Sequence, residues 1–106
     1  MMERDTYILN LILSKVKEMN PEAEVILFGS RARGTAKPES DWDILILLPD
    51  KIVSRNTEQT FRHALVDVEL ETGEAFSTFV ISKFDWKNKY NISPLYKSIE
   101  KEGVYL

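Results

Sequence analysis

Residues 25–48 read VILFGSRARGTAKPESDWDILILL, and this stretch decides the fold. Its two ends are apolar runs rich in β-branched and aromatic residues, which predict one strand at residues 25–28 and another at residues 41–48. The second strand is too continuously apolar to keep one face in water, so we expect it in the centre of a covered sheet. Between the strands, residues 31–40 carry Gly, Pro and basic side chains, which predict a loop with room for a helical turn at its start.

Amphipathic helices are expected on both sides of this stretch. Apolar residues at helical spacing predict a first helix over residues 5–19, and a following Asn-Pro pair ends it because the residue before a proline avoids the helical conformation. The same spacing predicts a second helix over residues 57–71. Asn56 or Thr57 is its expected cap, and Gly73 its expected stop.

The remaining C-terminal part predicts one more strand and one more helix. Residues 74–82 suit a strand, and residues 94–102 suit a helix because a Ser-Pro pair precedes them and Gly103 follows. The resulting order of helix, strand, strand, helix, strand, helix is typical of an α/β layer. We therefore predict a single domain over residues 1–106, with a small mixed sheet flanked by helices.

The composition is that of an ordinary globular domain. Of the 106 residues, 43% are apolar and 29% are charged, and the net charge is −3. No apolar run approaches the roughly 20 residues of a membrane span, and the charged N-terminus lacks a signal-peptide pattern, so we expect a cytoplasmic protein. The absence of Cys excludes disulfides and thiolate chemistry, and the single His argues against a His-rich metal site. Any chemistry must therefore come from carboxylates, hydroxyls and backbone amides.

The turn after the first strand has the features of a phosphate-binding loop. Gly29 allows a positive φ and the close approach of a ligand to the backbone, and Ser30 adds a hydroxyl donor beside free amides. If a helical turn begins there, its N-terminal amides favour anions. Arg31 and Arg33 add positive charge nearby. Together these residues predict a site for a phosphate group.

Asp41 and Asp43 form the second candidate element of a site. They lie two residues apart on a predicted strand, so they point to one face with attachment points about 6.6 Å apart. At an effective dielectric constant of 20, two full charges at that separation repel by roughly 2.5 kcal/mol. A divalent cation between them removes this cost, and carboxylate oxygens beside a phosphate site suit Mg²⁺.

Taken alone, each half of this pattern has a common structural explanation. Gly-Ser pairs are frequent in turns, and two Asp at alternate positions are usually a turn edge or the solvated end of a strand. The combination is more specific. A Gly-Ser pair followed after ten residues by Asp-x-Asp, each attached to an apolar strand, has a chance occurrence of roughly one in a thousand in a chain of this length.

This combined pattern resembles the signature of the polymerase-β-like nucleotidyltransferase superfamily, and it is most similar to the minimal, single-domain (MNT) branch. The matching positions are Phe28-Gly29-Ser30-Arg31-Ala32-Arg33-Gly34 and Asp41-Trp42-Asp43-Ile44-Leu45. The resemblance implies that Asp41 and Asp43 hold two Mg²⁺ ions. The implied reaction moves a nucleoside monophosphate from an NTP, expected to be ATP, to a hydroxyl and releases pyrophosphate.

The resemblance also assigns the nucleotide to the turn described above. It implies that Gly29 and Ser30 contact the triphosphate. Arg31 or Arg33 is then a further phosphate contact.

The sequence departs from the family pattern at one position. Active members carry a third carboxylate on a later strand, and the corresponding position here is Thr78 or Ser77, neither of which is acidic. Glu74 is an alternative third metal ligand if the strand register differs. Two interpretations therefore stay open: an active transferase with a divergent third ligand, or a catalytically weakened nucleotide- or partner-binding module of the same fold.

The resemblance extends to partners. Minimal nucleotidyltransferases are often paired with a small helical HEPN protein as toxin–antitoxin couples, so this chain is expected to be the antitoxin and to modify or hold such a partner. At 106 residues the domain provides mainly the nucleotide-handling part of a transferase. The acceptor is then expected from a partner protein, from a second copy in a homo-oligomer, or from a very small substrate. The net negative charge argues against a nucleic-acid acceptor.

Overall fold

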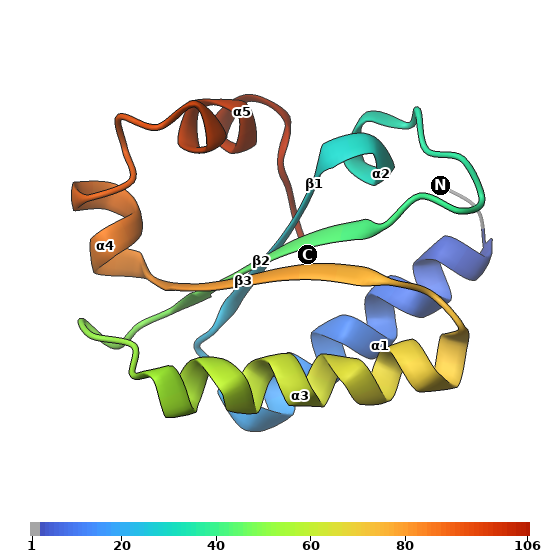
Figure 1. Cartoon of the computed structure of the whole chain (residues 1–106), viewed down its shortest axis with the longest axis horizontal. Coiled ribbons are helices and arrows are strands. Elements are labelled where there is room, and N and C mark those ends of the chain that lie inside the picture. Colours follow the sequence, from blue (N-terminus) through green and yellow to red (C-terminus); the bar gives the residue numbers. More distant parts are fainter. Residues whose placement is uncertain (1–2) are drawn as a thin grey trace.

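The computed structural model describes residues 3–106 and has a mixed α/β fold (Figure 1). Residues 1 and 2, part of the N-terminal segment that lacks a signal-peptide pattern, lie outside the described residues. None of the helices within residues 3–106 combines the length and apolar character needed to cross a membrane. In chain order the elements are α1 (Glu3–Met19), β1 (Glu24–Phe28), α2 (Gly29–Arg33), β2 (Trp42–Leu48), α3 (Arg55–Thr72), β3 (Phe76–Ser82), α4 (Lys83–Asn88), α5 (Pro94–Glu102) and β4 (Val104–Tyr105).

Within residues 3–106, four strands form one mixed sheet with the order β3-β2-β1-β4. β1 is antiparallel to both of its neighbours, whereas β2 and β3 are parallel and are connected through α3. The predicted mixed sheet flanked by helices is therefore confirmed, and β2 lies inside it as expected. The register places Asp43 between Phe28 of β1 and Ser77 of β3.

Helices cover both faces of the sheet, and alternate residues of β1 and β2 enter two separate cores (Figure 1). The larger core lies between the sheet and the pair α1 and α3, and it includes Trp42, Ile44 and Ile46 of β2. The smaller core lies between the sheet and α4 and α5, and it includes Leu45 and Leu47. Because side chains alternate along a strand, Asp43 is on the α4–α5 side of the sheet and Trp42 is on the α1–α3 side.

In the described part of the chain, three helices follow a serine whose hydroxyl accepts a hydrogen bond from a backbone amide of the first turn. Such a cap stabilises a helix by about 1 kcal/mol. The three pairs are Ser54 with Thr57, Ser82 with Asp85, and Ser93 with Tyr96. The expected cap of α3 at Asn56 or Thr57 is thus wrong by two or three residues, while the expected stop at Gly73 is confirmed by its φ of 76°.

Two short elements were not predicted from the sequence. Helix α4 follows β3 directly, because the Ser82 hydroxyl caps it and its Trp86 is buried against the sheet. Strand β4 pairs with β1 where a plain tail was expected. The bounds of two predicted strands also shift: β2 begins at Trp42 and β3 at Phe76, so both Asp41 and Glu74 lie just before a strand.

Candidate nucleotide- and metal-binding site

Gly29 joins β1 to α2, and this position requires a glycine. Its φ is 73°, a left-handed conformation that costs other residues roughly 1–2 kcal/mol. A Cβ atom at this position would also overlap the carboxylate of Asp43. The Gly-Ser turn and the second aspartate, which are separated in the sequence by the loop, are therefore in direct contact.

Asp43 lies at the start of β2 on the α4–α5 side of the sheet, and Asp41 lies just before the strand, close enough to act electrostatically on Asp43. Asp41 is exposed, and Asp43 is half-buried beside the turn. Within residues 3–106, neither carboxylate receives a hydrogen bond or forms an ion pair within 4 Å. The sequence predicted that these two side chains and the Gly-Ser turn belong to one site. The structure places all of them at one end of the sheet.

The charges around Asp43 are unbalanced. Burial raises the pKa of the Asp43 carboxyl above its ordinary value, the negative charge of Asp41 raises the pKa further, and Arg33 partly lowers it. Both raising effects act against the ionised form. A cation bound between the two carboxylates would offset both, because it replaces lost hydration and screens the repulsion.

Ser77 occupies the position beside Asp43 on the neighbouring strand. The register of the parallel pair sets Asp43 against Ser77, and paired residues of neighbouring strands point to the same face. Thr78 pairs instead with Ile44 and is buried on the α1–α3 side. Of the two positions that the sequence left open for a third ligand, the structure selects Ser77, which carries a hydroxyl.

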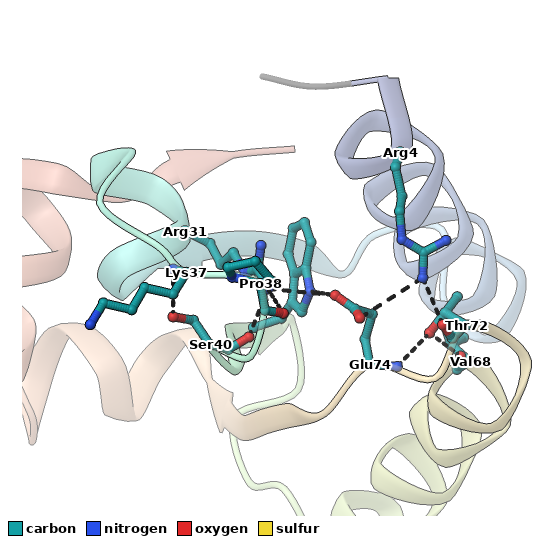
Figure 2. A network of polar contacts seen from close by, with 9 residues as sticks. Arg4, Arg31, Lys37, Pro38, Ser40, Val68, Thr72 and Glu74 are labelled. Atoms are coloured by element: carbon teal, nitrogen blue, oxygen red, sulfur yellow. Dashed lines mark hydrogen bonds and ion pairs between the residues drawn. The ribbon is translucent and has the colours of Figure 1, made fainter.

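Glu74 and Arg31, which the sequence linked to the metal and to the nucleotide, are held in a network on the Trp42 side (Figure 2). Glu74 Oε1 accepts a hydrogen bond from the Trp42 indole at 2.9 Å and lies 3.5 Å from Arg31 Nη2. Glu74 Oε2 lies 3.8 Å from Arg4 Nη2. Among residues 3–106, no three side chains of His, Cys, Asp or Glu gather into a metal-binding group, so Glu74 does not join the aspartate pair here.

The side chain of Arg31 is committed to this network. It is only 10% exposed, and its Nη2 donates to the carbonyl oxygens of Ser40 at 2.8 Å and Pro38 at 3.2 Å. The guanidinium also lies over the Trp42 ring, with Cζ 4.6 Å from the ring centroid. Arg33 differs from Arg31 because its side chain is exposed. Its Nη1 lies 3.5 Å from Oε2 of Glu102 in α5, and its positive charge lowers the pKa of Asp43.

A cleft of about 940 Å³ opens between the start of α1, α2 and residues 36–38. Neither Asp41 nor Asp43 lines this cleft. Its wall contains Arg4, Arg31 and Arg33, but each of these arginines already has a carboxylate partner. We therefore place the candidate site at the aspartate pair and not in this cleft.

Sequence reasoning missed an aromatic pair next to the carboxylates. Phe28 of β1 and Phe79 of β3 have ring centroids 5.9 Å apart, and Phe79 is 39% exposed. The register of the sheet places both rings on the same face as Asp43 and Ser77. The alternation of Ser77 and Phe79 was the available signal, but it indicates a shared face only once the strand pairing is known.

Comparisons with known proteins agree with this fold. A family model described as a nucleotidyltransferase domain matches residues 9–106. A solved structure described as "Crystal structure of the toxin-antitoxin with AMP-PNP" is similar in fold, with a TM-score of 0.66 and 18% sequence identity. The alignment covers 91% of this chain and 69% of that one. No curated protein sequence matched this chain.

Proposed function

This chain belongs to the nucleotidyltransferase domain family, and from that premise we propose that it transfers a nucleoside monophosphate from an NTP, with ATP as the expected donor, to a hydroxyl. The observation that carries the proposal is the contact between the Gly29 turn and Asp43. It unites a phosphate-binding turn and a carboxylate pair whose oxygens have no partner among the described residues.

The donor set fits one Mg²⁺ ion held by Asp41 and Asp43. Both ligands are hard oxygen donors, and Mg²⁺ in such sites keeps several waters and takes further ligands from substrate phosphates. When bound, the metal neutralises the charge that develops on the phosphate oxygens. A second ion would need a further carboxylate, which Ser77 does not supply.

The chain's own groups are then assigned to the nucleotide. The backbone amides of Gly29 and Ser30 and the Ser30 hydroxyl would contact the triphosphate, because they lie at the turn that packs directly against Asp43. Arg33 adds positive charge at the same end of the sheet. In the reaction, the acceptor hydroxyl loses its proton to solvent and its oxygen forms a bond to the α-phosphorus, while the bond from that phosphorus to the bridging oxygen breaks and pyrophosphate leaves.

The acceptor is proposed to be a hydroxyl of a partner protein, in a two-component toxin–antitoxin system with this chain as the antitoxin. The similar structure described as a toxin-antitoxin with AMP-PNP supports a nucleotide and a protein partner. A small helical HEPN-type protein is the expected partner, and a second copy of this chain is the alternative. Both would meet the donor nucleotide and Mg²⁺ in the cytoplasm, where we expect this chain.

A second candidate function follows from Ser77. Because a hydroxyl stands where a third carboxylate would complete the metal site, the chain can be a module that binds nucleotide and partner but transfers slowly or not at all. This alternative keeps the Gly29 turn and the aspartate pair as a binding site. It differs from the first only in the rate of the chemical step.

Transfer of a labelled α-phosphate separates the two functions. The wild-type chain and the Asp41→Asn/Asp43→Asn variant are incubated with Mg²⁺ and α-labelled ATP, each alone and with the protein encoded beside it. We expect label on the partner with the wild type and none with the variant. Nucleotide binding without label transfer would favour the binding module, and an absence of both would overturn the two proposals together.

A further inference from the structure

Within the described chain, the Asp41 side chain has no hydrogen-bond or ion-pair partner. The residues before and after it, in contrast, both contact Arg31. Ser40 precedes it, and the Ser40 carbonyl accepts a hydrogen bond from Arg31 at 2.8 Å. Trp42 follows it, and the Trp42 ring lies under the same guanidinium at 4.6 Å. One guanidinium therefore contacts both chain neighbours of this aspartate, through the backbone of Ser40 and the ring of Trp42.

The segment that leads into Asp41 depends on Arg31 for its attachment. The hydrogen bonds of residues 36–41 are of two kinds: those between Lys37 and Ser40, which are internal, and those from Arg31 to the Pro38 and Ser40 carbonyls. Within the part of the chain that the structure describes, Arg31 thus supplies the hydrogen bonds that tie this segment to the rest of the fold.

Arg31 is itself held on the side of the sheet opposite to the carboxylates. Its charge is balanced by Glu74 at 3.5 Å, and Glu74 in turn accepts the Trp42 indole N–H at 2.9 Å (Figure 2). The three side chains form a closed set of contacts beneath the start of β2. The Arg31 Nε atom has no hydrogen-bond partner within residues 3–106, and its burial keeps it out of contact with solvent.

We propose that Arg31 is a positioning residue for the metal site, which sets Asp41 at the correct place beside Asp43 through Ser40 and Trp42. This inference rests on the proposed function and replaces the expectation that Arg31 contacts phosphate. Magnesium demands near-ideal octahedral geometry with short metal–oxygen distances, so a displaced Asp41 lowers metal affinity even when the carboxylate is intact. Arg31 therefore acts on the metal, and Arg33 remains the arginine that faces the nucleotide.

The test measures binding of Mn²⁺ alone, as a spin-active substitute for Mg²⁺, to the full chain by electron paramagnetic resonance. Arg31→Lys keeps the charge opposite Glu74 but loses the planar fork, and we expect about tenfold weaker Mn²⁺ binding than in the wild type. Arg31→Met with Glu74→Gln removes the fork without leaving a buried carboxylate unpaired, and a loss of up to about 100-fold is expected. Arg62→Met, which removes an exposed arginine of α3, is the matched control and leaves Mn²⁺ affinity unchanged.

The outcomes separate the inference from the function beneath it. Wild-type Mn²⁺ binding that Asp41→Asn/Asp43→Asn abolishes establishes the metal site, and its absence would overturn the proposed function. If that site exists but the folded Arg31 variants bind Mn²⁺ as the wild type does and lose only ATP affinity, Arg31 is a phosphate ligand and the inference is wrong. Far-ultraviolet circular dichroism identifies folded variants, and Arg31→Lys alone decides the question if the double variant unfolds.

Discussion

The two faces of β2 differ in how the polar groups at its start are bonded. On the α1–α3 side, the Trp42 indole, Glu74, Arg31 and the Ser40 carbonyl are bonded to one another, although Arg31 Nε has no partner within residues 3–106, and Trp42 is fully buried. On the α4–α5 side, Asp43 and the neighbouring Asp41 have no hydrogen-bond partner within residues 3–106. The same short segment thus carries a bonded network on one face and open carboxylates on the other.

This difference indicates which face supports the fold and which is kept for a ligand. A network of hydrogen bonds and ion pairs such as this one stabilises the native state. Two open carboxylates of like charge repel each other unless something binds them, and burial together with the charge of Asp41 raises the pKa of Asp43. The chemistry of the site is therefore expected where the internal bonding is incomplete.

Removal of the Trp42 ring, which lies at the centre of the network, is expected to have the largest effect on stability. Trp42→Ala leaves a cavity in the core and should lower the free energy of unfolding by about 3–5 kcal/mol. Trp42→Phe keeps most of the ring but loses the hydrogen bond to charged Glu74, with an expected cost of about 1.5–3 kcal/mol. Urea denaturation measures both. A Trp42→Ala chain as stable as the wild type would contradict the structural role of this face.

Gly29 tests the contact between the turn and the open face. Gly29→Ala forces a left-handed alanine and drives its Cβ into the Asp43 carboxylate, so it should cost more than the roughly 1–2 kcal/mol of backbone strain and also weaken nucleotide binding. Gly34→Ala is the matched control, because its φ is 77° with nothing within 4 Å of the added Cβ. Equal stability losses and intact nucleotide binding in the two variants would show that the Asp43 contact is unimportant.

A substitution at Ser77 can add the third carboxylate that the open face lacks. Ser77→Asp places a third carboxylate beside Asp43, and we expect Mn²⁺ affinity to rise by about tenfold, or about 1.4 kcal/mol, while the metal-free protein becomes less stable. Thr78→Asp shifts the same change by one residue and buries a carboxylate in the α1–α3 core, so that variant should unfold. Tighter metal binding by Thr78→Asp than by Ser77→Asp would contradict the register.

The pH dependence of stability should show the smallest effect. Because the folded pKa of Asp43 lies above its ordinary value of 3.8, the folded state binds more protons than the unfolded chain between the two values. This contribution makes the free energy of unfolding fall as pH rises through that window. Denaturation in EDTA should therefore show a difference between wild type and Asp43→Asn that grows, in favour of the variant, as pH increases across it. A difference in the free energy of unfolding that stays constant with pH would show that Asp43 is not the source of this pH dependence.

Much of the fold was predictable because its signals are local. The apolar runs around the Gly-Ser turn predicted β1 and β2, and the Ser93-Pro94 start and Gly103 stop gave α5 its bounds. Helix α4 was missed because only six residues carry it, which is too short for a clear hydrophobic period. Its cap on Ser82 is a local signal for a helix start.

The site was predictable only in part, because some of its contacts join residues far apart in the chain. The Gly-Ser and Asp-x-Asp patterns located the turn and the carboxylate pair. The choice between Ser77 and Thr78 needed the register of β2 and β3, which no single strand contains. The network of Arg31 and Glu74 links residues 43 positions apart through Trp42, so the sequence alone assigned one to the nucleotide and the other to the metal.

Calorimetric titration of ATP into the chain, with and without Mg²⁺, tests the central claim most directly. The wild type should bind ATP in a Mg²⁺-dependent manner, and Asp41→Asn/Asp43→Asn should lose that dependence while it stays folded. Binding that ignores Mg²⁺, or that survives unchanged in the folded double variant, would contradict the claim that the open face of β2 is a metal–nucleotide site.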